Sequence, residues 1–188
     1  MTRILGISGS LRAGSYNTAL LRAAESLAGP SIELESATLH GIPLYDGDLE
    51  QREGIPPAVD ALKQKIVASD GVLLVTPEYN SGVPGVFKNA IDWLSRPVSD
   101  IARVFGDRPL ALIGASPGRF GTVVAQHGWL PVLRALGVRY WSGGKLMVSS
   151  ANQAFDEGGR LQDEAFRAQL ARFLEGYAAF IASSGRAR

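Results

Sequence analysis

The residues best suited to bind a small anion lie between Gly9 and Thr18, in the stretch GSLRAGSYNT. It contains neither GxGxxG nor GxxxxGK, so the dinucleotide fingerprint and the Walker loop are both missing. Its small residues allow backbone N–H groups to converge, its hydroxyl and amide side chains donate hydrogen bonds, and Arg12 adds a guanidinium. A helix beginning directly behind it would add unpaired N–H groups and a positive dipole end. The stretch predicts a site for a terminal phosphate monoester; the simpler alternative is a loop in which Ser15 or Asn17 only caps the helix.

A second stretch, TPEYNSGVPG from Thr76 to Gly85, combines rigidity with sharp turns. Its two prolines restrict the backbone and its two glycines permit tight turns. A rigid loop can hold backbone N–H and C=O groups in one plane, as the edge of a pyrimidine-like ring requires. Tyr79 offers a flat surface for stacking. The alternative is a tight turn in which Tyr79 is simply packed.

A third stretch, from Gly114 to Gly121, again contains small residues that allow close approach of a ligand to the backbone. Ser116 is a hydrogen-bond donor and Arg119 a cation near the rim. By itself this pattern is weak, because loops of Gly, Pro and Ser are common turns.

Short apolar runs alternate along the chain with longer amphipathic ones, which indicates alternating strands and helices. We expect strands over residues 4–7, 32–39, 72–76, 110–115 and 146–148, and helices over residues 20–28, 57–69, 86–94, 122–136 and 166–181. The third and fourth strands are apolar throughout, which is typical of strands covered on both faces of a parallel sheet. The first helix is expected to stop at Gly29-Pro30.

This order predicts an α/β fold with a doubly wound, five-stranded parallel sheet, right-handed crossovers and helices on both faces. Five strands favour the flavodoxin-like strand order 2-1-3-4-5, in which ligands bind at the carboxyl ends of the strands. Each of the three stretches above directly follows an expected strand. We expect one domain over residues 1–188, with a frayed tail from Ser183 to Arg188.

Two of these motifs carry a resemblance to a known family. GSLRAGSYN at residues 9–17, together with TPEYNSGVPGVFKNAIDW at residues 76–93, resembles the NAD(P)H-dependent FMN reductase family, which includes quinone and chromate reductases. The likeness extends over nearly the whole chain, and the pair of motifs is far more specific than either alone. It implies a flavodoxin-like fold, a tightly held FMN, and a dimer or dimer of dimers with active sites near the subunit boundaries.

The resemblance also implies which residues hold the cofactor. The FMN phosphate falls to the first motif, the isoalloxazine edge to backbone groups of the second, and a further contact to the third loop. The implied cofactor-binding residues are Ser10, Leu11, Arg12, Ser15, Tyr16, Asn17, Pro77, Glu78, Tyr79, Asn80 and Ser116. Many relatives have an aromatic residue after the Asn of the second motif, where this chain has Ser81-Gly82, so the substrate face is expected to differ.

No catalytic side chain and no metal site is predicted. The chain has no cysteine, its two histidines are far apart, and it contains no evident Ser-His-Asp or paired-carboxylate set. The run from Asp46 to Glu50 resembles the start of a calcium loop, but Gln51 stands where glycine is required, so a solvated loop is expected. His127 is expected to be a surface or capping residue. In a flavoenzyme the cofactor performs the redox chemistry, so no such set is needed.

Two classes of function fit a flavin site. The first is an enzyme that oxidises NADH or NADPH through FMN, by a ping-pong mechanism, and reduces quinones, free flavins, azo compounds or metal oxyanions such as chromate. The second is an electron carrier of the flavodoxin type that does not use nicotinamide. Such carriers are usually strongly acidic because they dock on basic partners, whereas this chain has a net charge of +1. The charge and the motifs favour the enzyme.

The same charge lacks the basic excess of nucleic-acid-binding proteins, and no apolar run is long enough to span a membrane. No targeting segment precedes the first expected strand, so we expect a cytoplasmic protein. The helix that carries Asp92 and Trp93 is expected to lie in the core or at an interface, with Trp93 buried. We expect a homodimer or homotetramer, with Trp93 as a candidate aromatic anchor.

Overall fold

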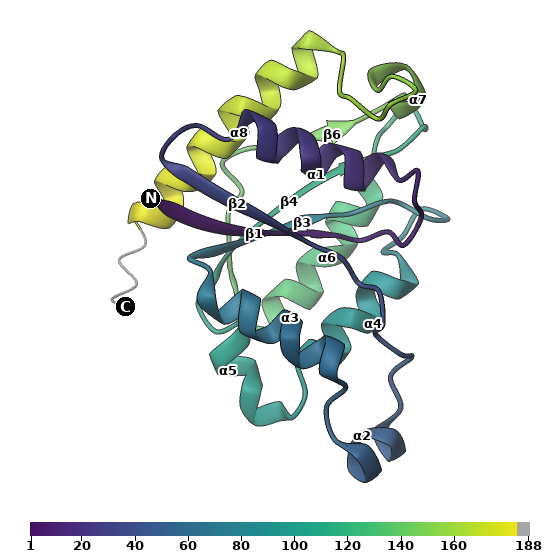
Figure 1. The fold of residues 1–188 in the computed structure, drawn as a ribbon, viewed down its shortest axis with the longest axis vertical. Helices are drawn as coiled ribbons and strands as arrows, with labels where there is room; N and C mark the ends of the chain where they lie inside the picture. The colour runs from purple at the N-terminus through teal and green to yellow at the C-terminus, as the bar shows by residue number, and fades with distance from the viewer. Residues whose placement is uncertain (184–188) are drawn as a thin grey trace.

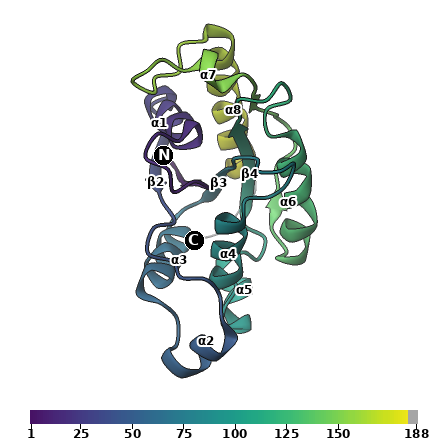
Figure 2. The same ribbon diagram turned by 90° about the vertical axis from the view of Figure 1, so that its right-hand side faces the viewer.

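The computed structural model describes residues 1–183, which form a parallel sheet between two layers of helices (Figures 1 and 2). The strands follow the order β2-β1-β3-β4-β5, with β6 also paired to β4, and every pairing is parallel. The strands are β1 (Thr2–Ser8), β2 (Ile32–Ala37), β3 (Gly71–Val75), β4 (Pro109–Ala115), β5 (Arg139–Tyr140) and β6 (Met147–Val148). The predicted flavodoxin-like order is therefore confirmed.

All five predicted helices are present, with ends that differ by a few residues. They are α1 (Tyr16–Leu27), α3 (Pro57–Ala68), α4 (Gly85–Leu94), α6 (Val123–Ala135) and α8 (Glu164–Ser183). The shorter helices, which sequence patterns did not reveal, are α2 (Gly47–Glu53), the 3₁₀ turn η1 (Val98–Asp100), α5 (Ile101–Val104) and α7 (Ala151–Ala154). Ser183 is the last residue of α8, so the expected frayed tail does not begin there; residues 184–188 lie outside the described part of the chain.

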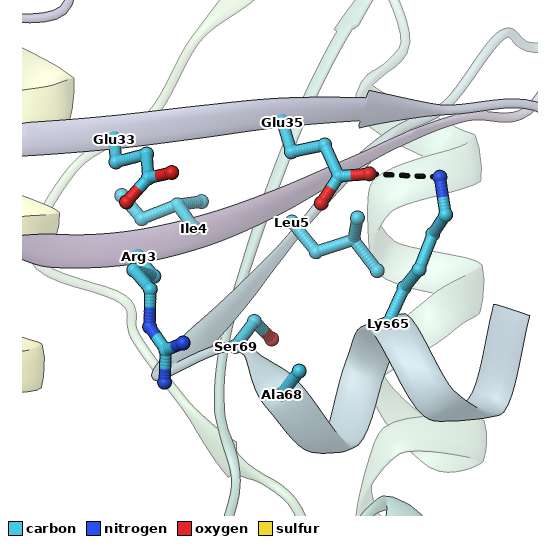
Figure 3. A pocket seen from close by; sticks show the side chains of 8 residues that line it. All are labelled: Arg3, Ile4, Leu5, Glu33, Glu35, Lys65, Ala68 and Ser69. Atoms are coloured by element: carbon cyan, nitrogen blue, oxygen red, sulfur yellow. Dashed lines mark hydrogen bonds and ion pairs between the residues drawn. The ribbon is translucent and has the colours of Figure 1, made fainter.

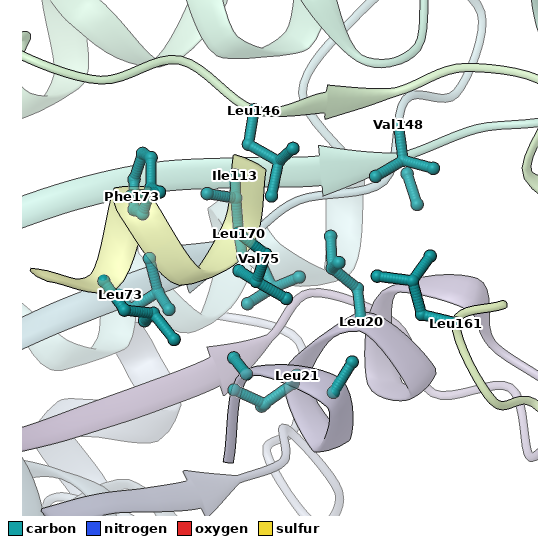
Figure 4. Packing of buried hydrophobic residues seen from close by; sticks show 14 of the residues in the cluster. Leu20, Leu21, Leu73, Val75, Ile113, Leu146, Val148, Leu161, Leu170 and Phe173 are labelled. Carbon is teal, nitrogen blue, oxygen red and sulfur yellow. The ribbon is translucent and has the colours of Figure 1, made fainter. Parts of the chain in front are cut away.

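The alternation of side chains along each buried strand divides the core into two halves. Leu73 and Val75 of β3 pack in one cluster with α1 and α8, as Figure 4 shows, whereas Val72 and Leu74 pack in the other with α3, α4 and α6. Because both faces are covered, the central strands consist of apolar residues throughout. The carboxyl ends of β1, β3 and β4 are thereby held rigidly at one edge of the molecule.

Two features differ from the expectations. The expected strand over residues 146–148 is present as β6, which pairs with Gly114 near the end of β4, but the sequence did not indicate β5, which pairs with Leu110 near the start of β4. Two-residue strands are too short to show a periodic pattern. The run after Asp46 is the helix α2 rather than a loop, because the Asp46 carboxylate caps it by accepting from the N–H of Asp48 at 2.9 Å.

Candidate functional site

The three loops identified in the sequence meet around one cavity at the carboxyl ends of β1, β3 and β4. The residues that line the cavity are Ser10, Arg12, Ser15, Tyr16, Asn17, Pro77, Glu78, Tyr79, Ala115, Ser116 and Pro117. Of the residues predicted to bind the cofactor, only Leu11 and Asn80 are not among them. Sequence reasoning missed Ala115 and Pro117, since neither side chain carries a polar group and only the loop's position could have indicated them.

The first loop presents several groups that can bind an anion. Ser15 is the N-cap of α1, and its Oγ accepts from the N–H groups of Asn17 at 3.2 Å and Thr18 at 3.3 Å. The hydroxyl proton of Ser15 is therefore still available to a ligand. Among residues 1–183, the exposed Arg12 guanidinium forms no ion pair or hydrogen bond. The capping alternative and the anion-site interpretation are thus compatible at Ser15.

Asn17 connects this loop to the end of β4. Its buried side chain donates from Nδ2 to the Ala115 carbonyl and accepts at Oδ1 from the Ala115 N–H, each at 2.9 Å. Both ends of the amide are thus used inside the protein. Asn17 therefore holds the first and third loops at a fixed separation across the cavity.

The second loop ends in a tight hairpin. Tyr79 and Gly82 exchange backbone hydrogen bonds of 3.3 and 3.1 Å, and the two residues between them, Asn80 and Ser81, both have positive φ (50° and 56°). These angles indicate a turn of type I′. The N–H groups of Glu78 and Asn80 donate to no acceptor within the described chain. The loop therefore offers backbone donors, and Tyr79, 46% exposed, offers a flat side chain beside them.

The close approach of the first two loops depends on Gly9. A Cβ at this position would overlap the buried Phe87 ring and lie 2.9 Å from Cδ of Pro77. Only glycine lets the chain pass this point, so Gly9 brings the anion-binding loop against the rigid second loop.

The third loop is held in place by β6 and α7. The Ser116 N–H donates to the Val148 carbonyl at 3.0 Å, and the Ser116 carbonyl accepts from the Ala151 N–H at 3.1 Å. Its Oγ accepts from the Gly118 N–H at 3.1 Å, which leaves the hydroxyl proton for a ligand. Ser116 thus has the donor that the sequence predicted, on a loop with a fixed backbone.

The other residues considered as candidates in the sequence, such as His127 and Asp92, do not form a second site in the structure. His127 is exposed on α6, with Nδ1 2.7 Å from the Val123 carbonyl oxygen, and Asp92 pairs with Lys88 at 2.7 Å. Trp93 is fully buried and donates from Nε1 to the Pro43 carbonyl. Within residues 1–183 there is no cluster of His, Asp and Glu that could hold a metal ion.

Two other cavities differ from the candidate site in the chemistry of their lining residues. The one in Figure 3 lies between β1, β2 and α3, and its charges are largely paired, with Lys65 2.8 Å from Glu35. The other adjoins the site, because Arg12 lines it together with Arg22 and the turn from Asp156 to Gly159. Neither has the rigid backbone donors of the second loop.

The donor set suits one kind of ligand. A cationic guanidinium, serine hydroxyls and the N-terminus of α1 fit a phosphate group. Rigid backbone N–H groups beside an exposed tyrosine fit the edge and face of a planar heterocycle. The arrangement therefore matches a phosphate monoester that carries a flat ring system, as the sequence predicted.

Known proteins are similar to this chain in sequence and in fold. Residues 2–153 match the family described as NADPH-dependent FMN reductase. The chain is 46% identical over 173 residues to an NAD(P)H-dependent FMN reductase of Pseudomonas aeruginosa (92% of this chain, 91% of that protein). It is 36% identical over 179 residues to a 2-hydroxy-1,4-benzoquinone reductase of Burkholderia sp (95% and 96%).

Among solved structures, FerB from Paracoccus denitrificans, a flavoenzyme NAD(P)H:(acceptor) oxidoreductase, superimposes with a TM-score of 0.86 at 32% identity. The alignment covers 98% of this chain and 99% of that one. A WrbA-like flavodoxin from Agrobacterium tumefaciens, at 14% identity and a TM-score of 0.66 over 98% and 99%, shares the fold.

Proposed function

Because the chain belongs to the NADPH-dependent FMN reductase family, we propose that it oxidises NADH or NADPH and reduces a quinone or another small acceptor through bound FMN. The observation that carries this proposal is the cavity where an anion-binding loop and a rigid loop with backbone donors meet at the carboxyl ends of the strands. Bound FMN would supply the redox chemistry, so the protein's task is to bind and orient it. No catalytic side chain is assigned.

We assign the binding roles by position in the cavity. Arg12, Ser10 and Ser15 would hold the phosphate, supported by the backbone of Tyr16 at the start of α1 and of Leu11 in the loop before it. Asn17 would act through Ala115, by keeping the first loop in place.

The ring would lie between the second and third loops. Its edge would meet backbone groups of Pro77, Glu78 and Tyr79, and of Asn80, which follows them in the same turn, and Ser116 would contact it from the opposite loop. Residues 1–188 would act as a single FMN-binding reductase domain. None of the helices among residues 1–183 is long and apolar enough to cross a membrane. We propose the cytoplasm as the location, since the reaction needs a supply of NADH or NADPH.

The proposal is tested with the purified protein under anaerobic conditions. Addition of NADH or NADPH alone is expected to bleach the flavin absorbance without any protein partner, and mass spectrometry of the released cofactor is expected to identify FMN. A carrier of the flavodoxin type would stay oxidised under saturating NADH and NADPH. Release of FAD would contradict the assignment of a single phosphate site.

The kinetic pattern should be ping-pong. Within the cavity the ring is assigned to one loop, residues 76–85 (the ring-binding loop), and no dinucleotide fingerprint is present elsewhere in the sequence, so nucleotide and acceptor are expected to use the same face in turn. Double-reciprocal plots against quinones, free flavins, azo dyes and chromate should give parallel lines, with excess acceptor competing against NAD(P)H. Intersecting lines, with a ternary complex detected directly, would contradict a shared face.

The protein is also expected to be a homodimer or homotetramer. Trp93 cannot be its anchor, because it is buried inside the chain. The exposed apolar residues of α4 and α6 (Val86, Val124 and Leu130) are better placed, since these helices pack together through the edge-to-face rings of Phe87 and Trp129. Light scattering should give at least twice the monomer mass of 20.0 kDa at micromolar concentration.

The interface is tested with two variants. Val124→Lys with Leu130→Lys should shift the protein toward monomer, because two charges would have to be desolvated in the contact. Leu44→Lys changes an equally apolar, 81% exposed residue outside these helices and should leave the mass unchanged. A 20 kDa particle for the wild-type protein would rule out a stable oligomer.

A further inference from the structure

The carboxylate of Glu78 lies on the N-terminus of α6, although the backbone of Glu78 belongs to the ring-binding loop (residues 76–85). Its Oε2 accepts hydrogen bonds from the N–H groups of Val124 and Ala125, both at 2.9 Å. Thr122, the N-cap of α6, gives the helix no capping hydrogen bond from its own side chain. The cap of α6 therefore comes from a residue more than 40 positions earlier in the chain.

A second tether joins the same loop to the same helix. Trp129 of α6 donates from Nε1 to Oγ1 of Thr76 at 3.0 Å, and that hydroxyl donates to the Pro77 carbonyl at 2.9 Å. Thr76 and Trp129 are both completely buried. The start of the loop is thus fixed by a buried network, whereas its ring-binding part is fixed by the Glu78 carboxylate.

This arrangement affects what the loop can offer a ligand. Because the Glu78 side chain is directed to α6, its negative charge is balanced by the positive end of the helix dipole. Its backbone N–H finds no acceptor among residues 1–183, and the residue lines the cavity. The Glu78 backbone therefore leaves a donor at the cavity wall, while the Glu78 carboxylate is engaged by the N-terminus of α6.

We propose that Glu78 is a positioning residue for the flavin ring. By holding the ring-binding loop on the N-terminus of α6, the Glu78 carboxylate determines how tightly the backbone of residues 77–80 binds the ring edge. The inference rests on the proposed function, which assigns only backbone contacts to Glu78, and it adds a role for the Glu78 side chain. It predicts that the acceptor oxygen of residue 78 matters more for FMN retention than its charge does.

The test compares three variants of the holoprotein with the wild type. Glu78→Gln keeps an acceptor oxygen at the same reach, Glu78→Ala removes it, and Asp46→Ala removes a carboxylate helix cap remote from the cavity. FMN release after dilution is followed by the recovery of FMN fluorescence, and the flavin absorption spectrum reports the contacts of the ring edge. Glu78→Ala should release FMN about tenfold faster and change the spectrum, as expected for the loss of one helix-capping interaction.

Glu78→Gln should release FMN at a rate within about threefold of the wild-type rate, which is less than the tenfold change that corresponds to 1.4 kcal/mol. Asp46→Ala should release FMN at the wild-type rate. If Glu78→Ala does not fold, Glu78→Asp, which keeps the charge but is one methylene shorter, should release FMN faster than Glu78→Gln. Equal release and equal spectra for Glu78→Ala and the wild type would overturn the positioning role while leaving the proposed function intact. A wild-type protein that holds no FMN would overturn both.

Discussion

Replacing Arg12 and Ser15 together by alanine is expected to weaken FMN binding by roughly 10²- to 10⁴-fold. Each side chain would contribute a charge-assisted hydrogen bond to the phosphate, and such bonds contribute about 1.5–3 kcal/mol each. Arg12 has no competing ion pair in the described structure, so its loss falls on the ligand rather than on the fold. The dissociation constant would be measured by quenching of FMN fluorescence.

The two single variants separate binding from folding. Arg12→Ala should leave the free energy of unfolding nearly unchanged, whereas Ser15→Ala also removes the N-cap of α1 and should cost about 1 kcal/mol of stability. Arg172→Ala, which removes an exposed arginine of α8, is the matched control for the loss of one positive charge. A double variant that binds FMN as tightly as the wild type would show that the phosphate lies elsewhere.

Replacing Asn17 by alanine should destabilise the whole fold as well as the site. The substitution leaves the N–H and C=O of Ala115 without their partner in a buried position, and each such group costs about 1–3 kcal/mol. We expect a loss of about 2–5 kcal/mol in the free energy of unfolding, measured by urea denaturation of the FMN-free protein so that weaker FMN binding does not add to the loss. FMN binding should weaken too, because the first and third loops would no longer be held together.

Asn152→Ala provides the comparison, since Asn152 is exposed on α7 and its loss should change stability by less than about 0.5 kcal/mol. The signature of Asn17 is the joint loss of stability and binding, in contrast to Arg12, which affects binding alone. If Asn17→Ala unfolds like Asn152→Ala, the hydrogen bonds to Ala115 are not essential to the architecture.

The features that the sequence predicted correctly are those that depend on neighbours along the chain. Alternating apolar runs predicted the strand order, because the residue pattern of a buried strand such as β4, and that of an amphipathic helix such as α8, each reflect the environment of the element. The motifs at residues 9–17 and 76–93 were recognisable because the groups that converge in each loop lie within a few residues of one another. Their meeting around one cavity followed from the topology of a parallel sheet.

What only the tertiary structure decided is the partner of each polar side chain. Asn17 could equally have capped α1 or faced a ligand; its contact with Ala115, 98 positions away, depends on how two loops meet. Glu78 was predicted to act through its backbone, and its carboxylate found the N-terminus of α6 only because β3 and β4 are neighbours in the sheet. Likewise Trp93 was expected to be buried in the core or at an interface, but only the folded chain shows that its Nε1 donates to the Pro43 carbonyl. Periodicity reports whether a side chain is buried, but a hydrogen-bond partner is selected by distance in three dimensions, and that requires the folded chain.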